Sequence, residues 1–97
     1  MAGPVEIQWS VDALDDLQRF ADFLHERYPR LAGRVAGELI TRTDVLRRHP
    51  QMGRPVGKSR VYRELVLAVF GGIYSLQYRY DGEVVLILRV LHSRELR

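Results

Sequence analysis

The sequence predicts an α+β fold, β-α-α-β-β-β in chain order, in which a helical hairpin packs on a mainly antiparallel sheet. Two observations predict it. After a short strand, the first half of the chain repeats its apolar residues at intervals of three and four, which is typical of amphipathic helices. The second half has a period of two and is rich in β-branched and aromatic residues, which is typical of strands. Because 97 residues have room for one core, we expect residues 1–97 to form a single domain.

The first half of the chain is predicted to form a strand over 5–9 and two helices over 11–28 and 29–48. Ser10 has the side chain of a helix N-cap, and Pro29 divides the helices, since the residue before a proline avoids helical backbone angles. The short break between the helices predicts an antiparallel hairpin. Acidic residues occupy the first turns of the first helix, where its dipole favours negative charge: Asp12, Asp15 and Asp16.

The second half is predicted to form a loop over 50–59 and then three strands over 61–69, 72–80 and 83–92. The loop is dense in glycine and proline and has no period. Asp81-Gly82 joins the last two strands and predicts a type I′ hairpin turn. The last strand is apolar on both faces, so we expect it to lie inside the sheet.

The composition argues against several kinds of site. The chain has no cysteine, which excludes disulfides, thiolate metal sites and a cysteine nucleophile. There is no glycine-rich phosphate loop and no HExxH motif, and the histidines lie far apart, so we expect neither a metal nor a cofactor. The N-terminus lacks the features of a signal peptide, and no apolar run approaches the roughly 20 residues that span a bilayer. We therefore expect a cytoplasmic protein that does not bind a membrane.

Charge is distributed unevenly along the chain. Residues 1–26 carry six acids and one base, a net charge of −5, whereas residues 27–63 carry ten bases and two acids, a net charge of +8. All the bases except Lys58 are arginines, whose planar fork suits phosphate and carboxylate groups. A basic middle predicts either nucleic acid or an acidic protein as a partner. A solvated helix face with an arginine bias is the alternative interpretation.

The three histidines are interpreted differently. His25 lies on the first predicted helix, where we expect a surface residue, and His49 lies at the end of the second, where a cation complements the dipole. His92 ends the last predicted strand among arginines. It is either a structural histidine that hydrogen-bonds the backbone or a general acid or base acting on a phosphodiester. If the protein is a nuclease, the candidate catalytic residues are Arg63, Arg89, His92 and Arg94.

Other cations are candidates for binding a target or partner. Arg63 and Arg79 lie on predicted strands, where they either bind phosphate or an acidic protein patch, or pair across strands, for example with a glutamate. The tyrosines of the 72–80 strand either stack on bases or, as we expect, pack in the core. The full set of binding candidates is Arg54, Lys58, Arg60, Arg63, Arg79 and Arg94.

Five blocks of the sequence, in order, resemble toxins of the ParE/RelE superfamily from type II toxin–antitoxin systems, and the ParE-like branch in particular. They are WSVDALDDL at 9–17, HPQMGRP at 49–55, REL at 63–65, YSLQYRY at 74–80 and RVLHSR at 89–94. Each block alone is weakly specific, but five in order span nearly the whole chain. The fold that the resemblance implies, a helical hairpin on an antiparallel sheet, agrees with the fold predicted from periodicity.

The resemblance implies two possible activities and one kind of partner. ParE-type members poison DNA gyrase, and RelE-type members cleave mRNA on the ribosome, often with a C-terminal tyrosine or a His-Tyr pair. Here Ser93 follows His92 and no tyrosine lies beyond Tyr80, which weakens the nuclease hypothesis, although Arg63 and His92 resemble part of such a site. The hypotheses are therefore a gyrase inhibitor, a ribosome-dependent endoribonuclease and a plain nucleic-acid-binding module. A cognate ParD-like antitoxin, folding as it binds, is the implied partner.

Overall fold

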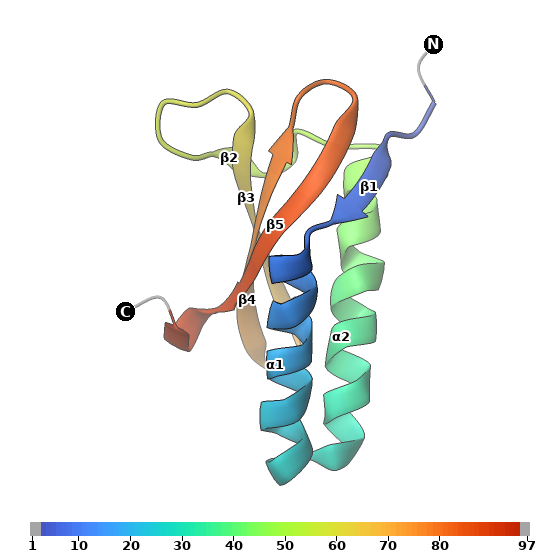
Figure 1. The fold of residues 1–97 in the computed structure, drawn as a ribbon, viewed down its shortest axis with the longest axis vertical. Helices are drawn as coiled ribbons and strands as arrows, with labels where there is room; N and C mark the ends of the chain where they lie inside the picture. The colour runs from blue at the N-terminus through green and yellow to red at the C-terminus, as the bar shows by residue number, and fades with distance from the viewer. Residues whose placement is uncertain (1–2, 96–97) are drawn as a thin grey trace.

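A helical hairpin and a five-stranded sheet form two layers in the computed structural model, which describes residues 3–95 (Figure 1). Neither long helix in this range combines the length and apolar character that crossing a membrane requires. The elements in chain order are β1 (Glu6–Trp9), α1 (Val11–Arg27), α2 (Pro29–Thr43), the 3-10 turn η1 (Asp44–Arg47), β2 (Arg54–Pro55), β3 (Tyr62–Val69), β4 (Gly72–Tyr80), β5 (Val84–His92) and the 3-10 turn η2 (Ser93–Glu95).

The strands lie in the order β1-β5-β4-β3-β2. β1 pairs with β5 in parallel, and the other neighbours are antiparallel. The predicted α+β class and the interior position of the last strand are therefore confirmed. The two-residue strand β2 lies inside the segment predicted as a loop, where it pairs with the start of β3.

The helices begin where the sequence predicts, but the second ends earlier. Ser10 caps α1 by accepting a hydrogen bond from the backbone N–H of Ala13 (3.0 Å). The expectation that the second helix continues to Arg48 is wrong, because α2 ends at Thr43 and the chain tightens into η1. The buried Thr43 hydroxyl donates to the carbonyl of Leu39 (2.7 Å), a back-bond that often bends helices.

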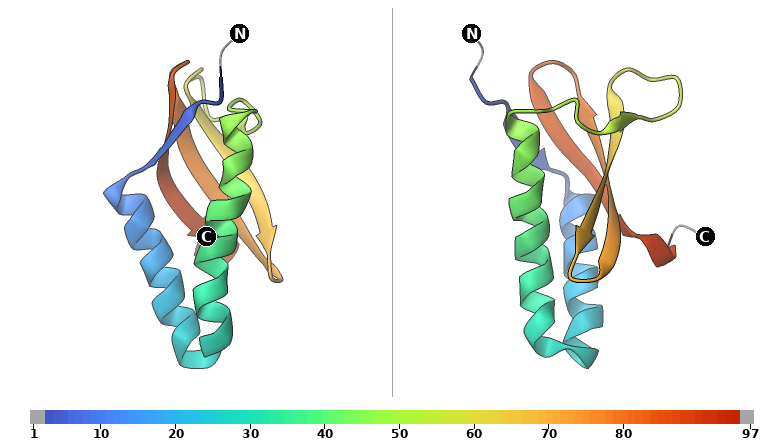
Figure 2. Two further views of the ribbon diagram at one scale, coloured as in Figure 1. Left: turned by 90° about the vertical axis from the view of Figure 1, so that its right-hand side faces the viewer. Right: turned by 180° about the vertical axis from the view of Figure 1, so that it is seen from behind.

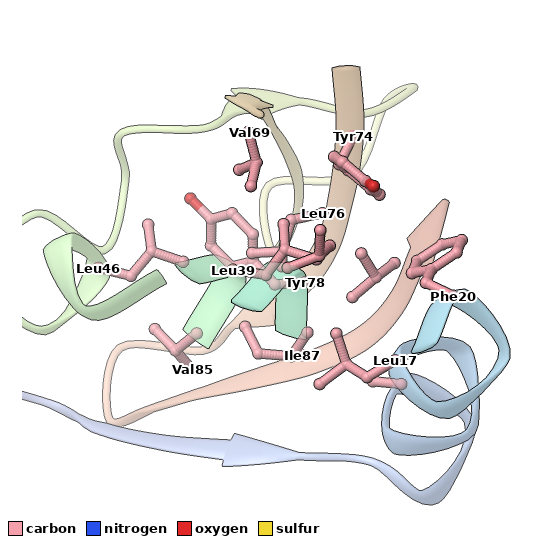
Figure 3. Close-up of a cluster of buried hydrophobic side chains, with 13 residues drawn as sticks. Leu17, Phe20, Leu39, Leu46, Val69, Tyr74, Leu76, Tyr78, Val85 and Ile87 are labelled. Carbon is pink, nitrogen blue, oxygen red and sulfur yellow. The ribbon is translucent and has the colours of Figure 1, made fainter. Parts of the chain in front are cut away.

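The helical hairpin covers one face of the sheet, and the core lies between them (Figures 2 and 3). The predicted core tyrosines of β4 are confirmed, since Tyr74 and Tyr78 are buried and Tyr80 packs against the same cluster. The opposite face is open and carries large side chains that are about half exposed. These are Tyr62, Val66 and Ile73. The buried apolar cluster consists of Ala13, Leu17, Phe20, Val35, Leu39, Leu46, Val69, Tyr74, Leu76, Tyr78, Val85, Ile87 and Val90.

The hairpin turn with two positive φ angles lies between β3 and β4, not between β4 and β5. The predicted type I′ turn at Asp81-Gly82 is wrong, because within residues 3–95 only Phe70 has a positive φ among the non-glycine residues. Phe70 (φ 47°) and Gly71 (φ 81°) connect the paired residues that end β3 and begin β4. At the turn between β4 and β5, the Asp81 carboxylate accepts hydrogen bonds from the backbone N–H groups of Glu83 and Val84. These bonds close a three-residue loop.

Candidate functional site

The loop that precedes β2 is fastened to the sheet by Tyr78. The Tyr78 hydroxyl donates a hydrogen bond to the carbonyl of Pro50 (2.7 Å) and accepts one from the backbone N–H of Gly53 (2.9 Å). Burial raises the pKa of Tyr78, so the hydroxyl keeps its proton. A Cβ atom at position 53 would lie 2.8 Å from the Glu64 carbonyl oxygen and from the Tyr78 ring and hydroxyl. Only glycine therefore lets the loop approach the sheet this closely.

Arg63 fastens the same loop from β3. Its Nη1 donates to the carbonyl of Gln51 (3.1 Å) and to that of Gly53 (2.7 Å). Pairing of Arg63 with a glutamate across strands, the alternative considered from the sequence, is wrong. The residues paired with Arg63 across the strands are Tyr78 on β4 and Pro55 on β2, and Glu64, next to it in β3, points to the opposite face of the sheet. The hydrogen-bond partners of the Arg63 guanidinium are therefore backbone carbonyls of the loop, and its role there is structural.

Glu64 holds Arg54 over the open face of the sheet. Arg54 donates to Glu64 Oε1 from Nε (3.2 Å) and from Nη2 (2.8 Å), and the buried hydroxyl of Ser75 donates to Oε2 (2.7 Å). The hydrogen bond from Ser75, followed by those from Arg54, lowers the pKa of Glu64. A hollow of about 220 Å³ lies beside this array and is lined by Arg54, Glu64, Val66, Ile73, Tyr74, Ser75 and Ser93.

A buried carboxylate that the sequence analysis missed joins α1 to the free edge of β5. β1 pairs with β5 only as far as Ile87, so the backbone N–H groups of β5 after Ile87 lack a strand partner on that side. A side chain of α1 takes the place of the missing strand. Asp16 is 2% exposed and accepts the backbone N–H of Val90 (2.8 Å). It also accepts hydrogen bonds from Arg89 Nε (2.8 Å) and Nη2 (3.0 Å) and from Arg19 Nη1 (2.6 Å). Arg89, a candidate catalytic residue, is therefore held by a structural acid.

The protonation of Asp16 reflects this environment. Burial by itself would raise the pKa of Asp16, but the hydrogen bonds from Arg89, Arg19 and Val90 outweigh it and keep the pKa below its ordinary value of 3.8. A signal for this site exists in the sequence. Asp16 falls between Ala13 and Leu17 on the helix face that is otherwise buried, where a carboxylate needs a partner.

His92 lies at the end of β5 and contacts its neighbours through ring and backbone. Its ring meets Tyr74 edge-to-face with centroids 5.0 Å apart. His92 Nδ1 accepts the backbone N–H of Arg94 (3.1 Å), and the His92 backbone N–H donates to Glu95 Oε1 (3.0 Å). The side chain of Arg94 is exposed. The structural interpretation of His92, a histidine that hydrogen-bonds the backbone, is thus the one that its contacts support.

The four nuclease candidates do not meet in one place. Arg63 is paired with Tyr78, whereas His92 is paired with Tyr74, four residues away along β4. At about 3.3 Å per residue and about 4.8 Å between strands, the backbones of Arg63 and His92 lie about 16 Å apart. Arg89 is bound to Asp16, and only Arg94 lies near His92.

The remaining binding candidates gather at the end of the sheet that carries β2. Lys58 and Arg60 are exposed on the connection between β2 and β3. Arg79 lies beside Tyr62 in the register and forms an ion pair with Asp81 (3.3 Å). Arg54 lies on β2 at the same end of the sheet, whereas Arg94 lies in η2, after the end of β5. His25 and His49 are exposed, and no group of three or more possible metal ligands was found within residues 3–95.

Comparisons with known proteins agree with this architecture. The family described as ParE toxin of type II toxin–antitoxin system, parDE, matches residues 7–97. Y4kP of Sinorhizobium fredii is 35% identical over 92% of this chain and 88% of its own length. Toxin RelE3 of Caulobacter vibrioides is 35% identical over 84% of this chain and 87% of its own length.

Two solved structures are similar in fold. A chain of the chromosomal ParDE toxin–antitoxin system from P. aeruginosa superposes with a TM-score of 0.77 at 19% identity, covering 94% of this chain and 98% of that one. A chain of the toxin–antitoxin complex RelBE2 from Mycobacterium tuberculosis gives a TM-score of 0.61 at 26% identity, covering 92% and 98%. The arrangement of helices and strands described above is therefore also that of these chains.

Proposed function

This chain belongs to the ParE toxin family of type II toxin–antitoxin systems, and from that premise we propose that it inhibits DNA gyrase by binding and has no chemistry of its own. The observation that supports the proposal is that the candidate catalytic residues of a nuclease do not come together in one site. A general acid or base must lie within about 3 Å of the proton that it moves, directly or through one water. The guanidinium groups of Arg63 and Arg89 are hydrogen-bonded to loop carbonyls and to Asp16, so neither is free beside His92 to bind the phosphate on which His92 would act.

The partner in this proposal is a cognate ParD-like antitoxin. The similar solved structures are described as a ParDE system and a RelBE2 complex, which supports an antitoxin partner for this chain. A partner that binds only the folded toxin would stabilise this small domain by mass action. Its acidic residues would meet the basic segment 27–63, or its basic residues would meet the acidic face of α1.

A supercoiling assay with purified gyrase, ATP and relaxed plasmid tests the proposal. We expect the protein to inhibit supercoiling and linear cleaved DNA to accumulate. His92→Phe keeps a ring against Tyr74 but has no nitrogen to move a proton, and we expect it to inhibit gyrase as the wild type does. Complete supercoiling at an excess of folded wild-type protein over gyrase would contradict the proposal.

A ribosome-dependent endoribonuclease is the second candidate function. It is favoured by relatives that carry the name RelE at 35% identity. In this case His92, with Arg94 beside it, would be the catalytic group, and His92→Phe would lose both mRNA cleavage on the ribosome and toxicity. Wild-type cleavage of mRNA in a purified translation system, with gyrase unaffected, would establish this alternative.

A further inference from the structure

A basic hairpin protrudes from the sheet at the end opposite the tip of the helices. We define it as residues 54–63, which include β2, the connection after it and the first two residues of β3. Figure 1 and the right view of Figure 2 show this connection projecting sideways from the sheet, at the end where β4 also turns into β5. It contains no acid, and its bases are Arg54, Lys58, Arg60 and Arg63. A protruding segment of one charge sign concentrates its field where a partner can approach.

The basic hairpin is ordered by its own hydrogen bonds. The backbone N–H of Val56 donates to the carbonyl of Tyr62 (2.9 Å), which closes the connection at its base. Inside it, the Ser59 hydroxyl accepts the N–H groups of Val61 (3.2 Å) and Tyr62 (3.4 Å), and Gly57 takes a φ of +63°. The preceding loop is fastened by Arg63. The cations are thus presented on a preformed support, which lowers the entropy lost on binding.

The four cations of the basic hairpin differ in whether another group of the protein already binds their charge. Glu64 neutralises Arg54, and two carbonyls hold Arg63. Neither Lys58 nor Arg60 belongs to any ion pair among the described residues. Both side chains are exposed. Lys58 and Arg60 are therefore the cations that can neutralise charges on another molecule.

We propose that the basic hairpin binds the phosphate backbone of duplex DNA through Lys58 and Arg60. This inference deepens the proposed function and rests on it, because the choice of duplex DNA as the ligand follows from gyrase, which acts on duplex DNA. Exposed cations are sufficient for contacts to phosphate, whereas most of the binding energy of a protein segment comes from a few anchors that are fully desolvated in pockets. Neither Lys58 nor Arg60 lines the hollow on the open face or the one formed by residues 48–52. Because phosphate contacts carry no sequence information, the binding is expected to be independent of DNA sequence.

The test is the salt dependence of binding to a fluorescent 20-base-pair duplex of arbitrary sequence, measured by anisotropy with the full-length chain. The test variant is Lys58→Gln/Arg60→Gln. The control, Arg27→Gln/Arg30→Gln, removes the same charge at the tip of the helical hairpin. Each lost phosphate contact lowers the magnitude of the slope of log K against log salt by about 0.9, so the test variant should lose about 1.8. With the same affinity extrapolated to 1 M salt, that loss makes binding at 50 mM salt about 200-fold weaker. The control should keep the wild-type slope.

Three results of the salt titration would overturn the proposal. They are no binding by the wild type at 50 mM salt, an unchanged slope in the test variant, or an equal loss of slope in the control, which would mean that net charge alone acts. Retained duplex binding with lost binding to an acidic antitoxin would also overturn it, because the basic hairpin would then be a protein-binding surface.

The supercoiling assay separates failure of this proposal from failure of the proposed function. If the wild type inhibits gyrase, and the test variant inhibits it equally and binds the duplex equally, the hairpin proposal is wrong and the function stands. If the wild type binds the duplex through Lys58 and Arg60 but leaves supercoiling complete, the DNA-binding assignment stands and gyrase inhibition is wrong.

Discussion

Replacing Asp16 by asparagine should destabilise the fold more than any other change of one acidic residue on α1. Asp16 is the acceptor for two arginines and for a strand-edge N–H group. Asparagine keeps the shape of the side chain and one oxygen for Val90. It removes the charge that Arg19 and Arg89 neutralise.

The size of the effect follows from the exposure of the partners. Hydrogen bonds to charged groups contribute about 1.5–3 kcal/mol, whereas fully exposed ion pairs contribute less than about 1 kcal/mol. The carboxylate of Asp16 is 2% exposed, but the side chains of Arg19 and Arg89 are 43% and 44% exposed, so water can solvate them after the change. We therefore expect Asp16→Asn to lower the free energy of unfolding by about 2 kcal/mol. Asp16→Ala also leaves the Val90 N–H without a partner and should cost about 1–3 kcal/mol more.

Urea unfolding followed by circular dichroism measures this difference, with Asp15→Asn as the matched control. Asp15 is an exposed neighbour on the same helix, and its change should alter the free energy of unfolding by less than about 0.5 kcal/mol. A change that small for Asp16→Asn as well would refute the assigned role of Asp16.

Acid adds a second check on Asp16. Because the folded-state pKa of Asp16 lies below its ordinary value of 3.8, its contribution is complete above that value and is lost as the pH falls through the folded-state pKa. The stability gap between the wild type and Asp16→Asn should be constant from neutral pH to about pH 5 and should shrink below about pH 4. A gap that persists unchanged at pH 2 would mean that the charge of Asp16 does not cause it.

Three further changes test the support around the loop. Gly53→Ala should lower the free energy of unfolding, measured in urea, by about 1–3 kcal/mol, because the added Cβ would collide with backbone. The control Gly37→Ala has open space around it on α2 and should raise the free energy of unfolding by about 0.5–1 kcal/mol. Equal effects of the two changes would refute the close approach at Gly53. Tyr78→Phe should cost about 1–3 kcal/mol in the same assay because buried backbone groups lose their partner, and a neutral effect would contradict this. Ser75→Ala should raise the Glu64 pKa in a carbon-detected NMR titration, and an unmoved pKa would show that the hydroxyl does not stabilise the carboxylate.

The sequence predicted the fold because each element carries its own local pattern. Ser10, Pro29 and the change of period after residue 60 fix the order of helices and strands, and the structure confirms that order. The errors arose where tertiary contacts override local preference. Phe70, a bulky residue, takes a positive φ that glycine or asparagine would favour, and its ring stacks under Arg34 at 4.7 Å. The stronger local signal at Asp81-Gly82 therefore predicted the wrong turn.

The candidate site was harder to predict because its contacts join distant parts of the chain. Asp16 resembled other acids of a first helical turn, and its partner Arg89 lies 73 residues away. Arg63 and His92 resembled parts of one site because sequence order does not reveal that they pair with different ends of β4. An isolated carboxylate on the apolar face of α1 was the one local sign of the buried cluster.

The charge imbalance of the sequence becomes a separation in space only for the basic hairpin, because Arg27, Arg30, Arg34 and Arg42 lie on the helical hairpin beside the acids of α1. α1 exposes Asp12, Asp15, Asp22 and Glu26, and the tip of its hairpin lies at the end of the molecule opposite the basic hairpin (Figure 1). A polyanion is repelled by the acidic helix and attracted by Lys58 and Arg60, although the net charge of the chain is only +3. Removing two positive charges at either end leaves the same net charge. A difference in DNA binding between the two double variants therefore reports the position of the charge and not its amount.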